Sequence, residues 1–233
     1  MTIDSVDNKK IKNIRKLNQK KYRDETNEFL VEGIHLVKEA YKEGLLKEVI
    51  LEENEEIDFK VDTTYVTYNV IKSISSLDTP YKIIGVCKKK EEKEINGNVL
   101  ILDGLQDPGN LGTIIRSAVA FNVDTIILSK DTVDLYNPKV VRSTQGMNFH
   151  INIIRRDLEH EINALKEKGY TVYSTDVING KNIKNVKVNG KYAIIMGNEG
   201  NGIRPAIEAF VNEKLYIPNY PEGRDTSESL NVA

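Results

Sequence analysis

From Val99 onward, short unbroken apolar runs alternate with segments whose apolar residues recur at helical spacing. Unbroken apolar runs are typical of buried strands, and their alternation with amphipathic helices predicts a mostly parallel sheet covered on both faces. The predicted strands are 99–102, 125–128, 151–154, 170–174, 192–196 and 215–217. The predicted helices are 113–121, 138–145, 158–168 and 205–210. The C-terminal part of the chain is therefore expected to be an α/β domain.

A second, smaller α/β pattern covers residues 29–87. Strands are predicted at 29–31, 49–51, 64–67 and 82–87, and helices at 34–43 and 69–75. The mixed-charge segment that follows, Lys88–Asn98, cannot bury much apolar surface, which is typical of a linker. We therefore expect an N-terminal domain at 1–90, a linker at 91–98 and a C-terminal domain at 99–233.

The chain begins with a basic segment. Between Lys9 and Arg23 there are eight basic residues and no acidic residue, and the apolar residues recur at helical spacing. This pattern predicts one amphipathic helix with a basic outer face. Such charge runs are commonly solvated faces that pack on their own domain. The alternative is that Lys12, Arg15 and Lys16 contact RNA phosphates, which would position RNA without reading its sequence.

Composition limits the classes of protein that are possible. The net charge of −2 is not typical of a general nucleic-acid binder, and the single cysteine, Cys87, excludes an internal disulfide. The three histidines have no cysteine or histidine partners at ligand spacing, so no metal site is expected. No apolar run approaches membrane-spanning length and the N-terminus has no apolar signal core, so we expect a cytoplasmic protein.

The stretch Asp103–Ala118, D-G-L-Q-D-P-G-N-L-G-T-I-I-R-S-A, connects the strand at 99–102 to the helix expected from Thr113. Its glycines would let the backbone approach a ligand closely, and Asn110 and Arg116 are the candidate polar groups. The spacing is neither G-x-G-x-x-G nor G-x-x-x-x-G-K-[ST], which disfavours an unrelated α/β enzyme acting on nucleotides.

Two later stretches give this one its meaning. They are Ile194–Ile203, I-I-M-G-N-E-G-N-G-I, and Leu215–Ala233, L-Y-I-P-N-Y-P-E-G-R-D-T-S-E-S-L-N-V-A. In this order and spacing, the three stretches resemble the motifs of the SpoU/TrmH family of RNA ribose 2′-O-methyltransferases, which belongs to the SPOUT class. The stretches F-L-V-E-G-I-H-L-V-K-E-A and L-D-T-P-Y-K-I-I-G-V resemble the N-terminal substrate-binding domain of that family, which is similar to a ribosomal-protein RNA-binding fold.

The resemblance implies methyl transfer from S-adenosylmethionine to a ribose 2′-hydroxyl of structured RNA. We favour large-subunit ribosomal RNA as the substrate, with transfer RNA as the alternative. A non-catalytic RNA-binding protein of the same fold is a further alternative. The resemblance also implies a trefoil knot in the C-terminal domain and a homodimer.

The family's motifs also imply roles for single residues. The arginine that matches Arg116 is the family's proposed base; because the pKa of a guanidinium lies above ~12, we assign it to stabilising the developing oxyanion instead. The other polar positions of the motifs, expected to orient Arg116, the ribose and the loops, are Asn110, Glu199, Ser229 and Asn231. The segments expected to cradle the cofactor lie at Gly197, Asn198, Ile217 and Leu230. Arg142 matches a segment on the RNA side of the site, where a phosphate contact and an ordinary surface arginine are both open.

Two departures from the family pattern bear on these expectations. The spacer Asn219–Ser227 is longer than usual, which could reshape the cofactor pocket. In the family, Ser-Leu-Asn-Val-Ala opens a C-terminal helix, and the sequence stops at Ala233. We expect the chain without that helix to bind S-adenosylmethionine poorly and to dimerise weakly.

Overall fold

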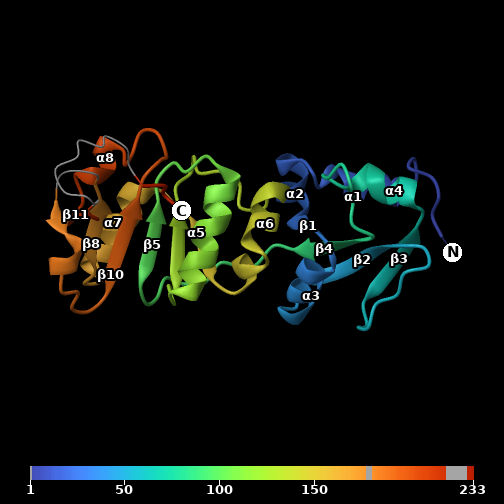
Figure 1. The fold of residues 1–233 in the computed structure, drawn as a ribbon, viewed down its shortest axis with the longest axis horizontal. Helices are drawn as coiled ribbons and strands as arrows, with labels where there is room; N and C mark the ends of the chain where they lie inside the picture. Colours follow the sequence, from blue (N-terminus) through green and yellow to red (C-terminus); the bar gives the residue numbers. More distant parts are fainter. Residues whose placement is uncertain (1, 177–179, 219–229) are drawn as a thin grey trace. The chain divides into compact units, whose positions relative to one another are not determined.

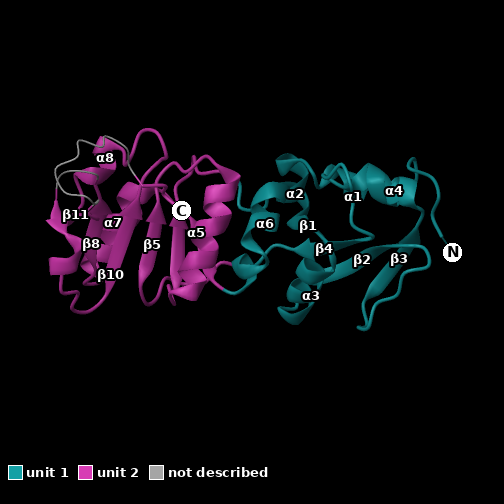
Figure 2. Cartoon of the chain, in the orientation of Figure 1, with its two compact units in different colours: residues 1–91, 134–150 teal, residues 92–133, 151–233 magenta. Residues whose placement is uncertain are grey.

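The computed structural model describes residues 2–176, 180–218 and 230–233 (Figure 1). The chain forms two compact units, which Figure 2 shows in different colours. Unit 1 comprises residues 1–91 and 134–150, and unit 2 comprises residues 92–133 and 151–233. Within the described ranges, no helix combines the length and apolar composition needed to cross a membrane.

Unit 2 is built on a parallel sheet. Its described strands are β5 (Val99–Leu102), β6 (Thr125–Leu128), β7 (Asn152–Arg155), β8 (Thr171–Thr175), β9 (Lys181–Asn182), β10 (Tyr192–Met196) and β11 (Glu213–Tyr216). They lie in the order β7-β6-β5-β10-β8-β11-β9, and each neighbouring pair is parallel. The predicted parallel-sheet α/β fold is therefore confirmed.

The helices of unit 2 bury their apolar stripes against this sheet. They are α5 (Pro108–Ala120), α7 (Leu158–Glu167) and α8 (Pro205–Glu208), with a short 3-10 turn at Ile183–Asn185. The main core joins the sheet to α7 and α8, with Ile101, Ile127 and Ile195 from the strands meeting Ile162 and Ile207 from the helices. Fully burying one such side chain stabilises by about 1.5–3 kcal/mol.

Helix α5 begins five residues earlier than the apolar periodicity indicates, at Pro108 and not at Thr113. Asp107 is the N-cap, and its side chain accepts a hydrogen bond from the Asn110 N–H at 2.9 Å. Proline is favoured in the first turn because its fixed φ suits a helix and it lacks an N–H that would have no partner there. The expectation of a glycine loop up to Gly112 was therefore wrong, since Gly109 and Gly112 lie inside the helix.

Unit 1 contains a mixed sheet in the order β1-β4-β2-β3. Its strands are β1 (Glu28–Glu32), β2 (Leu46–Glu52), β3 (Asp62–Val66) and β4 (Ile83–Lys88). Helices α3 (Ile34–Lys42) and α4 (Tyr68–Ile74) pack against it, as the sequence predicted. Gly44 follows α3 with a φ of +68°, the left-handed conformation expected after a helix end.

The basic N-terminal segment forms two helices, α1 (Lys9–Lys16) and α2 (Lys20–Thr26), where the sequence predicted one. The break has a tertiary cause, because the side chain of Asn18 donates to the carbonyl of Ile74 at 2.6 Å and Gln19 is extended. Arg23 also departs from the predicted basic outer face. It is only 3% exposed, and it pairs with Asp134 at 2.5 Å and donates to the carbonyl of Leu17.

The two units differ from the predicted domains in two segments. Residues 134–150, which connect β6 to β7 and include α6 (Pro138–Thr144) and the 3-10 turn Met147–Phe149, belong to unit 1. Their apolar residues Val141 and Phe149 share a core with Phe29 of β1, and the rings of Phe29 and Phe149 are 6.1 Å apart. Most of the predicted linker belongs to unit 2, where the N–H of Asn98 donates to Asp124 at 2.7 Å.

Candidate functional site: the carboxyl edge of the parallel sheet

The carboxyl ends of β5, β6 and β10 lie at the same edge of the unit 2 sheet. From β5 the chain continues outward to β6 and β7, and later returns on the other side of β5 as β10. The point between β5 and β10 is thus where the strand order reverses, and open α/β sheets bind ligands at such points. The segments that meet there are the loop after β5, the start of α5 and the loop after β10.

Glu199, in the loop after β10, binds the start of α5. Its carboxylate accepts hydrogen bonds from the N–H groups of Gln106 (3.2 Å) and Asp107 (3.1 Å) and from the amide of Asn110 (3.1 Å). Partial burial alone would raise the pKa of this carboxyl, but its hydrogen bonds outweigh burial and lower the pKa below its ordinary value. The structure therefore brings together two of the predicted site residues, Asn110 and Glu199.

The loop after β10 is held in a compact shape by its own backbone. Asn198 and Gly202 exchange backbone hydrogen bonds of 2.9 and 3.0 Å, and the Asn198 side chain donates to the carbonyl of Gly104 at 2.8 Å. A Cβ on Gly197 would lie 2.2 Å from the carbonyl carbon of Gly202, so only glycine fits there. The two predicted cofactor residues of this loop, Gly197 and Asn198, thus fix the loop against the end of β5.

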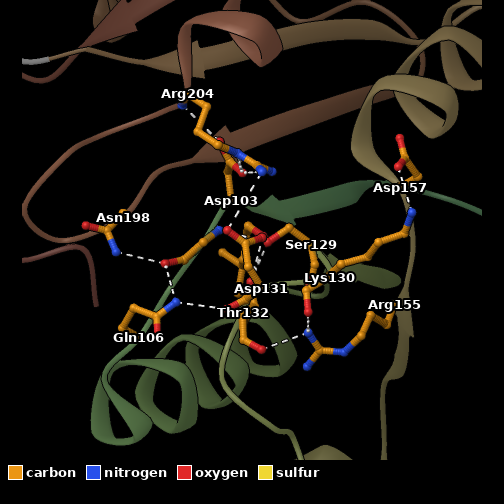
Figure 3. Close-up of polar contacts among 12 residues, drawn as sticks. Asp103, Gln106, Ser129, Lys130, Asp131, Thr132, Arg155, Asp157, Asn198 and Arg204 are labelled. Atoms are coloured by element: carbon orange, nitrogen blue, oxygen red, sulfur yellow. Dashed lines mark hydrogen bonds and ion pairs between the residues drawn. The ribbon is translucent and has the colours of Figure 1, made fainter.

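An ion pair that the sequence analysis did not assign fastens the far end of the same loop. Asp103, directly after β5, has a fully buried side chain that accepts from the Arg204 backbone N–H at 2.9 Å and from its Nε at 2.8 Å (Figure 3). The guanidinium also lies 3.7 Å from Asp131. Hydrogen bonding to Asp103 raises the pKa of Arg204. Asp103 could have been noticed as a carboxylate that ends an apolar strand.

A second unpredicted arginine organises the loop after β6. The guanidinium of Arg155 donates to the carbonyls of Ser129 (2.6 Å), Thr132 (2.7 Å) and Val133 (2.9 Å) (Figure 3). The Ser129 hydroxyl in turn accepts from the N–H of Gly104 at 2.9 Å. The loops after β5, β6 and β10 therefore form one hydrogen-bonded edge.

Comparison with known proteins identifies this arrangement. Residues 97–233 match the profile of the SpoU rRNA Methylase family, and residues 8–85 match the MRM3-like substrate binding domain. The chain belongs to the SpoU rRNA methylase family. The predicted family, and with it the predicted class of enzyme, an RNA methyltransferase, are confirmed.

Relatives along the whole chain agree with this assignment. The chain is 39% identical to the 23S rRNA (guanosine(2553)-2′-O)-methyltransferase RlmP of Bacillus subtilis, over 99% of this chain and 94% of the relative. It resembles the structure of a putative RNA methyltransferase of the TrmH family from Porphyromonas gingivalis, with a TM-score of 0.86 and 27% identity over 98% of this chain and 94% of that one. It also resembles an AdoMet-bound rRNA methyltransferase from Sinorhizobium meliloti, with a TM-score of 0.85 and 28% identity over 100% of this chain and 92% of that one.

Arg116, the residue to which the family motifs give the central role, lies on the exposed side of α5. Among the residues that the structure describes, it makes no hydrogen bond and no ion pair. The structure therefore places Arg116 on the same helix as Asn110 without a direct contact between them. An arginine without a structural partner remains available to a substrate.

The C-terminal motif of this SpoU methylase is described only in part. Ser229 and the long spacer at 219–227 lie outside the described residues. Ile217 and Leu230 are 54% and 60% exposed, and the side chain of Asn231 accepts a hydrogen bond from the N–H of Ala233 at 2.9 Å. In the described part of the chain, no hydrogen bond joins Asn231 to Glu199 or Asn110.

The predicted RNA-contacting residues of the family's substrate domain fall into two places within unit 1. Lys12, Arg15 and Lys16 line one groove of about 640 Å³ on α1 and the start of α2, which also contains Tyr22. Lys12 pairs there with Asp7, an exposed residue, at 2.8 Å. Arg142 lies apart from this groove on α6, where it is bound to other residues of unit 1. Across the described ranges, no group of three or more potential metal ligands is found.

Proposed function

We propose that this protein transfers a methyl group from S-adenosylmethionine to a ribose 2′-hydroxyl of large-subunit ribosomal RNA. The observation that carries the proposal is the contact between the family's motifs, since Glu199 of the second motif binds Asn110 and the start of α5 in the first. The similarity to a 23S rRNA 2′-O-methyltransferase along the whole chain supports the substrate class.

The loops at the carboxyl edge fit S-adenosylmethionine. The loop after β10 exposes glycine backbone at Gly200 and Gly202, which can approach a ligand without an intervening side chain. The exposed apolar side chains of Ile217 and Leu230 suit an adenine ring. We assign the backbone around Gly197, Asn198, Ile217 and Leu230 to holding the adenosyl part. When bound, this cofactor supplies a methyl group on a positively charged sulfur.

The residues of this chain would act mainly by positioning the reacting oxygen and stabilising its charge. Arg116 donates hydrogen bonds to the 2′-oxygen as negative charge develops on it, and stays protonated because its pKa lies above ~12. The hydroxyl proton leaves to another acceptor. Asn110, Glu199, Ser229 and Asn231 hold the ribose and the loops around it. Because attack of an oxyanion on a sulfonium destroys charge, exclusion of water would favour the step.

The family resemblance supports three further parts of the proposal. The loops of unit 2 pass through a trefoil knot, two copies of the chain form a dimer, and the protein acts in the cytoplasm. The substrate-binding domain corresponds to residues 1–90 and the methyltransferase domain to 99–233, joined by residues 91–98.

The proposed function is tested with S-adenosylmethionine carrying a radioactive methyl group. The purified protein is incubated in parallel with unmodified 23S rRNA, 16S rRNA and transfer RNA. We expect label in the 23S rRNA and background in the other two. Label in transfer RNA alone would favour the transfer RNA alternative, and RNA binding without label in any sample would favour a non-catalytic RNA-binding protein.

The groove on α1 yields a prediction about binding. Replacing Lys12, Arg15 and Lys16 with glutamine is expected to weaken binding to all RNAs similarly and to lower the salt dependence by roughly one logarithmic unit per lost phosphate contact. The measurement is RNA affinity at several salt concentrations. The matched control replaces Lys38, Lys42 and Lys82, three exposed, ion-paired lysines elsewhere in unit 1. An equal loss of slope in the control would return the groove to an ordinary solvated face.

A further inference from the structure

Tyr81 is an exposed aromatic residue in the part of unit 1 that connects α4 to β4. Its side chain is 53% exposed although one side of the ring is packed against protein. A Cβ on Gly33 would lie only 3.3 to 3.4 Å from ring carbons of Tyr81, so the absence of a side chain at Gly33 allows the ring to rest on the backbone. The ring is therefore fixed on one side and open to solvent on the other.

Arg142 is held beside the residue that precedes Gly33. Its Nη1 donates to the hydroxyl of Ser76 at 2.6 Å and lies 3.5 Å from the carboxylate of Glu32, whose side chain is 4% exposed. The same carboxylate accepts from the N–H and the hydroxyl of Ser76 and from the hydroxyl of Ser75. One nitrogen of the guanidinium is thus anchored in a buried network.

The rest of this guanidinium is available to a ligand. The Arg142 side chain is 26% exposed, and its Nε and Nη2 make no hydrogen bond to any residue that the structure describes. An arginine with one fixed nitrogen and further free donors is suited to a phosphate, because the planar fork can bind two oxygens. Its negative neighbour, Glu32, is already satisfied by Ser75, Ser76 and Arg142.

The ring and the guanidinium flank consecutive residues. Tyr81 contacts Gly33 and Arg142 contacts Glu32, whose α-carbons are about 3.8 Å apart. Tyr81 and Ser76 also belong to the same short connection between α4 and β4. An aromatic platform and a phosphate donor therefore lie within reach of one or two nucleotides.

We infer that Tyr81 and Arg142 form one subsite for an unpaired RNA nucleotide. A base stacks on the open side of the Tyr81 ring, and a neighbouring phosphate accepts hydrogen bonds from Arg142. Stacking on an aromatic side chain tolerates any base, so the subsite recognises unpaired RNA and not a particular sequence. The inference rests on the proposed RNA methyltransferase function and names the part of unit 1 that holds the substrate.

The test measures the affinity of the full chain for unmodified 23S rRNA, with thermal unfolding recorded for each variant. Tyr81→Ala is expected to weaken binding roughly 10-fold or more without changing its salt dependence, because stacking involves no phosphate. Tyr81→Phe keeps the ring and is expected to bind as the unchanged protein does. The matched control is Tyr68→Ala, which removes a 45% exposed tyrosine at the start of α4 and is expected to leave the affinity unchanged.

A second variant tests the phosphate contact. Arg142→Lys keeps a positive charge beside Glu32 but loses the planar fork, and is expected to weaken binding several-fold without unfolding unit 1. Wild-type affinity in both Tyr81→Ala and Arg142→Lys would overturn the subsite, and so would an equal loss in Tyr68→Ala. Failure of the unchanged protein to bind RNA would overturn the proposed function itself, together with this subsite.

Discussion

Replacing Arg116 with alanine is expected to lower the rate of methyl transfer by about 10²–10³-fold or more, the range found when a group that stabilises a developing oxyanion is removed. Arg116 is exposed on α5 and has no hydrogen-bond or ion-pair partner among the described residues. The substitution should therefore leave thermal unfolding and cofactor affinity unchanged. The measurements are single-turnover methyl transfer, calorimetric binding of S-adenosylmethionine and a melting curve.

A charge control separates the role of Arg116 from a general loss of basic surface. Lys130, also in unit 2, has a side chain that is 72% exposed and pairs only with Asp157 at 2.8 Å among the described residues. Lys130→Ala is expected to keep a nearly normal rate. A near-normal rate in Arg116→Ala would show that the catalytic assignment is mistaken, whatever the control does.

Replacing Arg204 with alanine is expected to destabilise unit 2 by about 2–4 kcal/mol. The reason is that the carboxylate of Asp103 has a fully buried side chain, and removing one partner of a buried ion pair leaves an uncompensated charge. The cost stays below the upper end of that range because the backbone N–H of residue 204 still donates to Asp103. Since this pair fastens the loop after β10, affinity for S-adenosylmethionine should fall as well. Denaturant unfolding and calorimetry measure the two effects.

Two further variants make this expectation specific. Arg156→Ala removes a partly exposed arginine that pairs with the partly exposed Glu92, and should cost less than about 1 kcal/mol. The double variant Asp103→Asn with Arg204→Ala removes the uncompensated charge and should recover part of the lost stability. If Arg204→Ala were no more destabilising than Arg156→Ala, the pair would have no role in holding the loop.

The sequence was sufficient for the strands of unit 2, because strands buried on both faces leave unbroken apolar runs. The runs 99–102, 125–128 and 192–196 became β5, β6 and β10 without a change of boundary. The start of α5 could not be read from the same signal, since its first turn, Pro108–Leu111, has few apolar residues. The capping signal Asp107-Pro108 was the better indicator there.

Tertiary context explains what the pattern did not predict. The apolar residues of α6 have helical spacing, but spacing does not reveal which core they enter, and Val141 joins that of unit 1. The single predicted basic helix is broken because Asn18 and Arg23 bind distant residues. Of the site, the family motifs located Asn110 and Glu199, whereas Asp103, Arg155 and Arg204 were missed because their partners lie far away in the sequence.

The central claim is that the methyl group is transferred to a ribose 2′-oxygen, and nucleoside analysis tests it most directly. The protein is incubated with unmodified 23S rRNA and labelled S-adenosylmethionine, and the RNA is digested to nucleosides that are separated by chromatography and mass. The account predicts that all label is found in a 2′-O-methylated nucleoside and that Arg116→Ala leaves this nucleoside almost unlabelled. Label in a base-methylated nucleoside, or unlabelled RNA from a protein that binds both RNA and cofactor, would contradict it.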